Sequence, residues 1–168
     1  MAPAGVAAGP HQGGQMEEHA LFTGFWSKES TTTSKVLARI PEGSDYRPDP
    51  KSRIAREIAW QIVVEEQMLV EALERGTVLA PVRPLPETME EVCAVYERQR
   101  QDIISRLHAL TPERWNGTLE CFGRQRPASP MAWSFLFDIV HHRGQLTTYL
   151  RAMGSTVPQI YGPSADEP

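Results

Sequence analysis

Four helix-length segments separated by proline-rich connections constrain the fold of this chain most strongly. Within each segment, apolar residues recur three or four positions apart, the spacing that places side chains on one face of an α-helix. Prolines and turn-forming residues fill the connections, where proline interrupts a regular helix. Only residues 117–122 suggest a short extended piece. The sequence therefore predicts an all-α fold, a four-helix bundle, with helices over roughly residues 17–40, 52–75, 86–110 and 131–154.

The chain is expected to form one domain, because 168 residues suffice for one sizeable core and are too few for two. Residues 1–15 are rich in alanine, glycine and proline, contain no lysine or arginine, and lack the apolar region of a signal peptide. We expect them to be a flexible tail. The domain then comprises residues 16–168, including an irregular tail after Gly154 whose apolar residues should pack against the helices.

Charge, hydropathy and cysteine content argue against several classes of protein. The net charge is −4 and no basic tract with interleaved aromatic residues occurs, so no nucleic-acid partner is expected. No apolar run approaches the ~20 residues of a membrane span, so no membrane partner is expected either. Cys93 and Cys121 do not form a CxxC motif and are expected to be reduced, which fits a cytoplasmic location.

The last helical segment carries candidate metal ligands within its apolar stripe. Asp138 and His142 are four residues apart, so they lie one above the other on what we expect to be a buried face. A carboxylate and an imidazole in this arrangement can share a divalent cation. The alternative is a buried Asp–His hydrogen bond without a metal, since a DxxxH pair alone is a weak signal. His141 is expected at the rim or behind the ligands.

The second helical segment adds an acidic candidate. We place Glu65 at the centre of an apolar face that includes Ile62 and Leu69, and Gln61 at the edge of that face. A buried carboxylate is costly unless it is paired or bound to something. We therefore predict that Glu65 and Gln61 meet Asp138 and His142 in one pocket.

The last segment also suggests how the chain assembles. It is apolar on nearly all sides, as Leu136 and Val140 illustrate, and such a helix must be covered nearly all round. A homodimer interface would cover it, and so would the first helix together with the C-terminal tail. Arg143 and Arg151 would then either pair with acidic groups across an interface or lie on a solvated face.

Several short strings stand out along roughly residues 17–165. They are Ile40-Pro41, Tyr46-Arg47-Pro48, Ala59-Trp60, His141-His142-Arg143-Gly144-Gln145-Leu146, Tyr149-Leu150-Arg151 and Gly154-x-x-Val157-Pro158-x-x-Tyr161-Gly162. These strings, in this order, resemble landmarks of the DinB family. The resemblance implies a four-helix bundle, commonly a homodimer, with a metal site between helices.

The resemblance implies a ligand pattern from which this chain departs. Family members typically use three histidines, one from the second helix and two from an HxxxH in the last helix. Here the last-helix pair is Asp138 and His142, and Gln61 stands where the second-helix histidine is expected. Glu65, one turn further on, can supply the missing charge. The candidate ligands are therefore Glu65, Asp138 and His142, with Gln61 as an auxiliary group.

This ligand set changes the metals that would be preferred. Three imidazoles suit Zn, Ni or Cu, whereas one imidazole with two carboxylates shifts the preference toward Mn, Fe or Mg, with Zn still open. The alternative is that the metal has been lost and a hydrogen-bonded polar cluster remains.

Two classes of function follow. In the first, the protein is an enzyme whose metal activates a water or a substrate thiol, with Glu65 or His141 handling protons. The family resemblance then implies a metal-dependent hydrolase or a transferase acting on a low-molecular-weight thiol. In the second, the protein is a non-catalytic dimeric bundle whose pocket binds a small molecule or only stabilises the fold.

Overall fold

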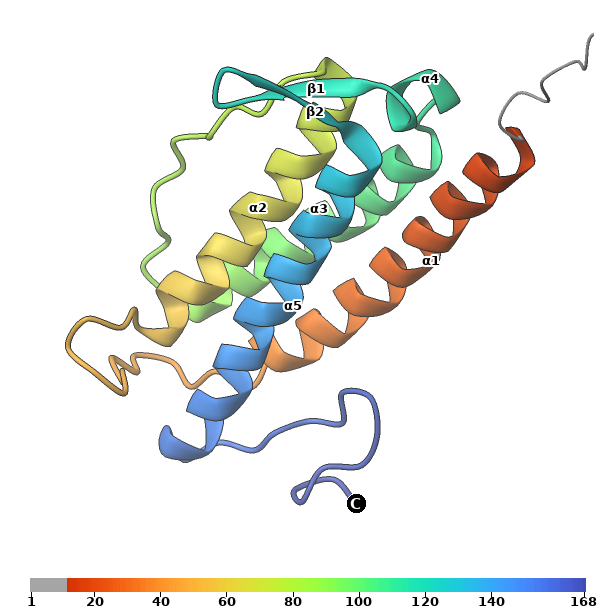
Figure 1. Ribbon diagram of the computed structural model, residues 1–168. Helices are drawn as coiled ribbons and strands as arrows, with labels where there is room; N and C mark the ends of the chain where they lie inside the picture. The colour runs from red at the N-terminus through yellow and green to blue at the C-terminus, as the bar shows by residue number, and fades with distance from the viewer. Residues whose placement is uncertain (1–11) are drawn as a thin grey trace, which may run out of the picture.

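The computed structural model describes residues 12–168, with side chains from residue 17 onward, and it confirms the predicted helical bundle (Figure 1). Two short strands form an antiparallel hairpin, in which Thr118 pairs with Pro127 and Cys121 with Arg124. The elements are α1 (Gln12–Leu37), α2 (Ala55–Arg75), α3 (Met89–His108), α4 (Pro112–Trp115), β1 (Thr118–Cys121), β2 (Arg124–Pro127) and α5 (Ala128–Ala152).

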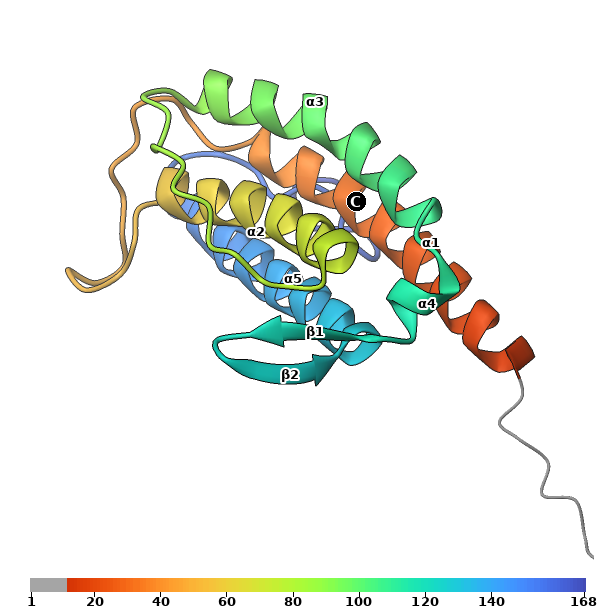
Figure 2. The same ribbon diagram turned by 90° about the horizontal axis from the view of Figure 1, so that it is seen from above.

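The four long helices surround one core. α2 packs against α3 and α5, and α1 packs against the same two helices, so α1 and α2 lie across the bundle from one another (Figure 2). Within residues 12–168, no helix is long and apolar enough to cross a membrane. The largest side chains fully buried in the core include Trp26, Tyr96, Phe22, Ile62 and Leu69.

The ends of the helices follow from local chemistry. Thr88 caps α3, because its side chain accepts a hydrogen bond from the backbone N–H of Glu91 at 3.1 Å. Gly76 ends α2 in the left-handed conformation, with φ of 82°, and its N–H donates to the Ala72 carbonyl at 2.8 Å. The expected extended piece at 117–122 corresponds to β1.

α1 begins at Gln12, inside the segment expected to be a tail, and residues 1–11 of that segment lie outside the described residues. The helix continues through its polar middle. There the Ser30 hydroxyl donates to the Ser27 carbonyl at 3.0 Å, as serines in helices often do. Glu29 and Thr33 are buried, so this polar stretch faces the interior.

The polar residues expected at the centre of the buried faces of α2 and α5 lie at their edges. In α2, the predicted apolar residues such as Ile62 and Leu69 are buried, but the glutamate in the core is Glu66, which is 1% exposed. The Glu65 side chain is 14% exposed, so the prediction that Glu65 lies at the centre of this face is wrong. In α5, the buried face runs through Ile139 and Arg143, and the Asp138 side chain is 54% exposed. The prediction that Asp138 is buried is also wrong. One residue corresponds to a rotation of about 100°, which moves a side chain from the core to the edge of the interface between α2 and α5.

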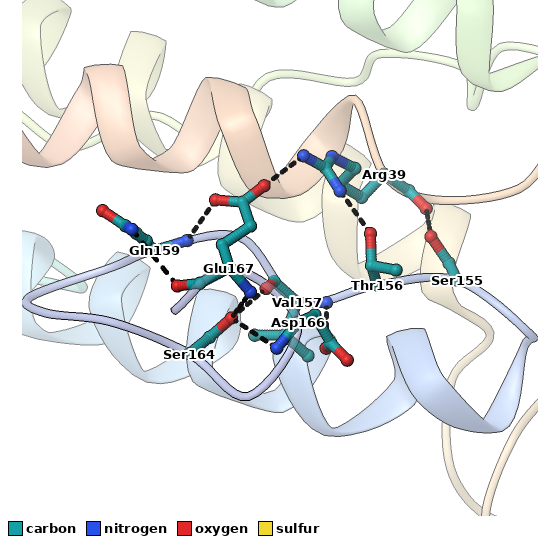
Figure 3. A network of polar contacts seen from close by, with 8 residues as sticks. All are labelled: Arg39, Ser155, Thr156, Val157, Gln159, Ser164, Asp166 and Glu167. Atoms are coloured by element: carbon teal, nitrogen blue, oxygen red, sulfur yellow. Dashed lines mark hydrogen bonds and ion pairs between the residues drawn. The ribbon is translucent and has the colours of Figure 1, made fainter.

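The C-terminal tail returns over the bundle and is held by polar contacts (Figure 3). Arg39 forms an ion pair with Glu167, and Arg151 pairs with Asp166 at 3.0 Å. Arg151 therefore pairs within its own chain. The predicted packing of the tail is confirmed for two of its apolar residues, Val157 and Ile160.

Candidate metal-binding site

Glu65, Asp138 and His142 converge where α2 packs against α5. Glu65 Oε1 lies 4.0 Å from His142 Nε2, and Asp138 Oδ2 lies 3.6 Å from the same nitrogen. One ligand atom from each residue lies within 4.8 Å of the other two. The spacing of four residues along α5 stacks Asp138 on His142, and the packing of α2 places Glu65 opposite them. The structure thus brings together the three residues that the sequence singled out.

The distances suit a shared ion. Two ligand atoms that each bind an ion at about 2.1 Å are about 3.4 Å apart in tetrahedral geometry and about 4.2 Å apart when they lie on opposite sides. The separations of 3.6 Å and 4.0 Å fall between these limits.

Gln61 lies between the ligands, and its surroundings test whether a cation fits. Its Nε2 lies 2.6 Å from Glu65 Oε1 and 2.7 Å from His142 Nε2. Its own Oε1 is buried without a hydrogen-bond partner, and so is Glu65 Oε2. Leaving a buried acceptor unpaired costs about 1–3 kcal/mol, so two such atoms in one cluster require an explanation. A cation together with its water would supply partners for both oxygens, so these residues fit a divalent ion.

Gln145 sets the orientation of His142. The Gln145 Oε1 lies 3.0 Å from His142 Nδ1, and an amide oxygen can only accept, so Nδ1 carries the proton. This tautomer leaves Nε2 unprotonated, as a metal-binding imidazole requires. In the structure Nε2 lies 2.7 Å from Gln61 Nε2, with Asp138 Oδ2 and Glu65 Oε1 farther away, at 3.6 Å and 4.0 Å. The Gln145 amide nitrogen also lies 3.1 Å from His141 Nε2. His141 is exposed at the rim of the cluster, and Gln145 links the two histidines.

The electrostatics of the cluster favour a cation. Burial raises the pKa of Glu65, and the negative charge of Asp138 raises it further. The hydrogen bond from Gln61 and the positive charge of Arg53 act in the opposite direction on this pKa. A bound cation would relieve the repulsion between the two carboxylates and favour the ionised form of both.

Sequence reasoning missed a cavity of about 230 Å³ that adjoins His142. Two of its cationic residues, Lys51 and Arg53, belong to the connection before α2. The sequence predicted a helix from residue 52, which would include Arg53, whereas α2 begins at Ala55. Neither cation was singled out as part of a site. The cavity is lined by Lys51, Ser52, Arg53, Ile58, His142, Gln145 and Tyr149.

Comparison with known proteins identifies the family. The sequence model described as "DinB family" matches residues 16–168, nearly the whole domain. This chain belongs to the DinB family. Its DinB relatives include a Bacillus subtilis protein described as "Uncharacterized protein YrdA", which is 25% identical over 150 residues, covering 87% of this chain and 89% of YrdA. The uncharacterized protein YjoA of the same organism is 20% identical over 148 residues, covering 86% of this chain and 96% of YjoA.

Solved structures of DinB-like proteins share the fold. The crystal structure of YjoA superposes with a TM-score of 0.72 at 18% identity, covering 86% of this chain and 99% of YjoA. A DinB-like protein from Bacillus cereus ATCC 10987 gives a TM-score of 0.70 at 23% identity, covering 83% of this chain and 95% of that chain. The predicted family and fold are therefore confirmed, whereas the ligand cluster rests on the residues of this DinB chain alone.

Proposed function

We propose that this DinB-family protein is a metal-dependent enzyme that binds a divalent cation through Glu65, Asp138 and His142. The observation that carries the proposal is the pair of buried acceptors without partners, Gln61 Oε1 and Glu65 Oε2, inside a group of metal-ligand side chains. Other buried atoms of the described residues also lack a partner, at Trp26, Glu66, Gln99 and Trp115, so the position of this pair among metal-ligand side chains is what points to an ion.

The chemistry of the ligands bears on the choice of ion. Two carboxylates and one imidazole suit Mn or Fe better than a site of three imidazoles does, and Zn also accepts this combination. Ni is the less suited alternative. Because the Asp138 side chain is 54% exposed, the site is open on one side, as a catalytic centre requires for water or substrate.

The reaction that we propose is either hydrolysis or transfer of a low-molecular-weight thiol. When bound, the ion would lower the pKa of a water or thiol at the open side of the site. Glu65 Oε2, which has no partner, can accept the proton that this group loses. His141 lies outside the cluster at its exposed rim, where it can exchange protons with solvent. Gln145 holds both histidines in place by its amide contacts.

One observation favours a second candidate, a non-catalytic bundle that has lost its metal. The Gln61 amide group already lies within hydrogen-bond distance of both Glu65 Oε1 and His142 Nε2, at 2.6 Å and 2.7 Å. A glutamine in this position can hold the two side chains together without an ion. The pocket would then bind a small molecule or only stabilise the fold.

Metal analysis separates the two candidates. Protein purified without a histidine tag and equilibrated with Mn, Fe or Zn should retain about one ion per chain, measured by mass spectrometry of the elements. Asp138→Ala and His142→Ala should each remove most of the metal, and His141→Ala should weaken binding less. His108→Ala, an exposed histidine on α3, serves as the control. Metal retention by the His142→Ala variant equal to that of the wild type would exclude the proposed site.

We also propose that the protein is a homodimer. Leu136, expected to form the interface, is only 4% exposed within the single chain, so it is not available for this role. α1 and α5 instead expose a neighbouring aromatic group. Phe25 and Phe137 flank Trp133, with ring centroids 6.1 Å and 6.0 Å from it, and are 44% and 64% exposed. Such a patch is typical of an interface.

Phe137→Asp should therefore shift the protein toward the monomer in sedimentation equilibrium. A monomeric wild type at micromolar concentration would contradict the proposal of a homodimer.

The location that we propose is the cytoplasm. Cys93 and Cys121 are both free, as is usual in a reducing compartment. Burial raises the pKa of the Cys93 thiol, so this cysteine stays protonated and is a poor nucleophile. Thiol labelling of the protein inside intact cells should find both cysteines reduced.

A further inference from the structure

The cavity beside the metal-ligand cluster has a size and a lining that suggest a specific role. Its volume of about 230 Å³ is smaller than the roughly 300–1,000 Å³ of a typical pocket for a drug-sized ligand. It therefore suits one chemical group of a ligand better than a whole ligand. His142 lines the cavity and also belongs to the cluster, so the two sites share a wall.

Two cationic side chains give this cavity its charge. Neither Lys51 nor Arg53 forms an ion pair within the part of the chain that the structure describes. The Tyr149 hydroxyl of α5 lies 3.4 Å from the Arg53 carbonyl oxygen, which ties this connection to the wall of the cavity. On a chain of net charge −4, two free cations in one concavity favour an anion there.

The cavity also lies close to the ligand cluster. Ile58, which lines it, precedes Gln61 by three residues on α2, a rise of about 4.5 Å along the helix. An anion in the cavity is therefore about one helical turn from Gln61 and adjoins His142, beyond which lie the Glu65 and Asp138 carboxylates that repel it. A cation at the cluster would remove that repulsion, so the two sites should bind their ligands cooperatively.

We propose that this cavity holds the carboxylate group of a small-molecule substrate whose reacting end lies at the metal site. The inference rests on the proposed function, because the ion defines where the reacting end lies. Arg53 offers a planar fork of donors that matches the two oxygens of a carboxylate, and Lys51 adds a compact positive charge. Gln145 and Ser52 supply further polar groups to the same wall.

Calorimetric titration with succinate tests the proposal, with the neutral succinamide as the matched ligand. The metal content of each protein is measured first, so the proposed function is judged on a separate readout. Wild-type protein loaded with Mn should bind succinate and not succinamide. Lys51→Ala and Arg53→Ala should keep the metal and each weaken succinate binding about tenfold, because each removes a charged hydrogen-bond donor. Lys28→Ala removes an exposed cation of α1 and should change nothing.

Three results would overturn the carboxylate site: succinate affinity unaffected by both substitutions, equal binding of succinamide, or tighter binding of inorganic phosphate with the same dependence on Lys51 and Arg53. If the protein takes up no metal, the proposed function fails on that measurement alone. The titrations on metal-free protein then decide the present proposal. A tenfold loss of succinate affinity in the metal-free Lys51→Ala and Arg53→Ala variants supports the carboxylate site, and unchanged succinate affinity refutes it.

Discussion

Neighbouring residues on α2 and on α5 belong to two polar centres of different character. Glu65 and His142 lie in the ligand cluster, at the edge of the interface between the two helices. The next residues, Glu66 and Arg143, lie in the interior. Since successive residues of a helix are about 100° apart, one step along each chain leads from one centre to the other.

In the interior centre, an arginine of α5 is matched by partners from two other parts of the chain, α1 and the tail. Arg143 is 2% exposed, and its guanidinium forms an ion pair with Glu29 of α1 at 2.6 Å. It also donates to the Glu29 carbonyl oxygen at 3.1 Å and to the Tyr161 hydroxyl of the tail at 2.6 Å. The expectation that Arg143 lies on a solvated face or at a subunit interface is therefore wrong. The ion pair fixes α5, α1 and the tail relative to one another.

Three carboxylates show how the two centres differ. Glu29 is neutralised by Arg143. Glu66 accepts a hydrogen bond from Tyr96 at 2.9 Å, and burial raises its pKa to about 8, so it is neutral at pH 7. Glu65 has neither an ion-pair arginine nor full burial. One oxygen of Glu65 and one of Glu66 have no partner, so this feature is common to both centres. What differs is the charge: in the interior it is paired at Glu29 and removed by burial at Glu66, whereas Glu65 lies beside Asp138 and His142, where a ligand can bind it.

Removing Arg143 should have the largest effect on stability. Arg143→Ala leaves the Glu29 carboxylate, 8% exposed, without its counter-ion, and breaking a buried pair in this way costs about 3–5 kcal/mol. Urea denaturation should show this loss in the free energy of unfolding. In metal-free protein, His142→Ala should cost less, about 1–2 kcal/mol, because it removes the contacts with Gln61 and Gln145 while the Asp138 carboxylate stays exposed to water. Equal losses in the two variants would contradict the distinction between the centres.

The protonation of Glu66 should make stability depend on pH. Its pKa rises from 4.5 to about 8 on folding, so between these values the folded state holds one proton more than the unfolded state. The free energy of unfolding should therefore fall as the pH rises through this range, by at most about 1.4 kcal/mol per pH unit. The loss of stability is absent at pH values below the pKa of Glu66 in the unfolded state and complete at pH values above its pKa in the folded state.

Glu66→Gln should remove this slope in urea titrations between about pH 5 and 8. The matched control is Glu90→Gln, which changes an exposed carboxylate at the start of α3 and should keep the slope of the wild type. Parallel pH profiles for the wild type and Glu66→Gln would show that Glu66 is ionised in the folded protein, and hence that the interior does not neutralise it.

The sequence was sufficient to predict the bundle, the family and the meeting of Glu65, Gln61, Asp138 and His142. It was not sufficient to predict which of two neighbouring polar residues on each helix lies in the core. On α2, apolar residues such as Ile62 and Leu69 flank both Glu65 and Glu66 at helical spacing, so both positions are compatible with the pattern. The packing of α1 and α3 decides between them, and this information is not local to α2.

The sequence could not predict polar contacts between distant segments either. Glu29 and Arg143 are 114 positions apart, and the pattern of neither segment indicates which residue it contacts. The polar middle of α1 is poor in helix-favouring residues, yet its buried Glu29 and Ser30 serve as partners for side chains of other helices. A polar residue within a helical pattern thus indicates either an exposed face or an interior partner, and only the fold distinguishes the two.

A substitution at Gln61 tests whether the ligand cluster, unlike the interior centre, binds a metal ion. Gln61→His replaces an amide with an imidazole beside Glu65 and His142 and creates the histidine that the family pattern places there. Zn and Ni affinity should rise about tenfold, because a second imidazole suits these ions. Gln67→His on the same helix, where Gln67 contacts Glu71, is the control. An unchanged affinity in competition with a chelator would indicate that the Gln61 position does not face the ion.

The smallest effect concerns the tail. The Tyr161 hydroxyl accepts from Arg143 and donates to Glu29 Oε2 at 2.9 Å, yet the residue is 65% exposed. Tyr161→Phe should therefore cost only about 1 kcal/mol, because water can take over the lost hydrogen bonds and the ion pair beneath remains intact. The ion pair of Arg39 with Glu167 (Figure 3) and that of Arg151 with Asp166 continue to hold the tail. A loss in urea denaturation as large as that of Arg143→Ala would show that the tail is part of the interior centre, whereas a small loss would assign the stabilisation to the Arg143–Glu29 pair.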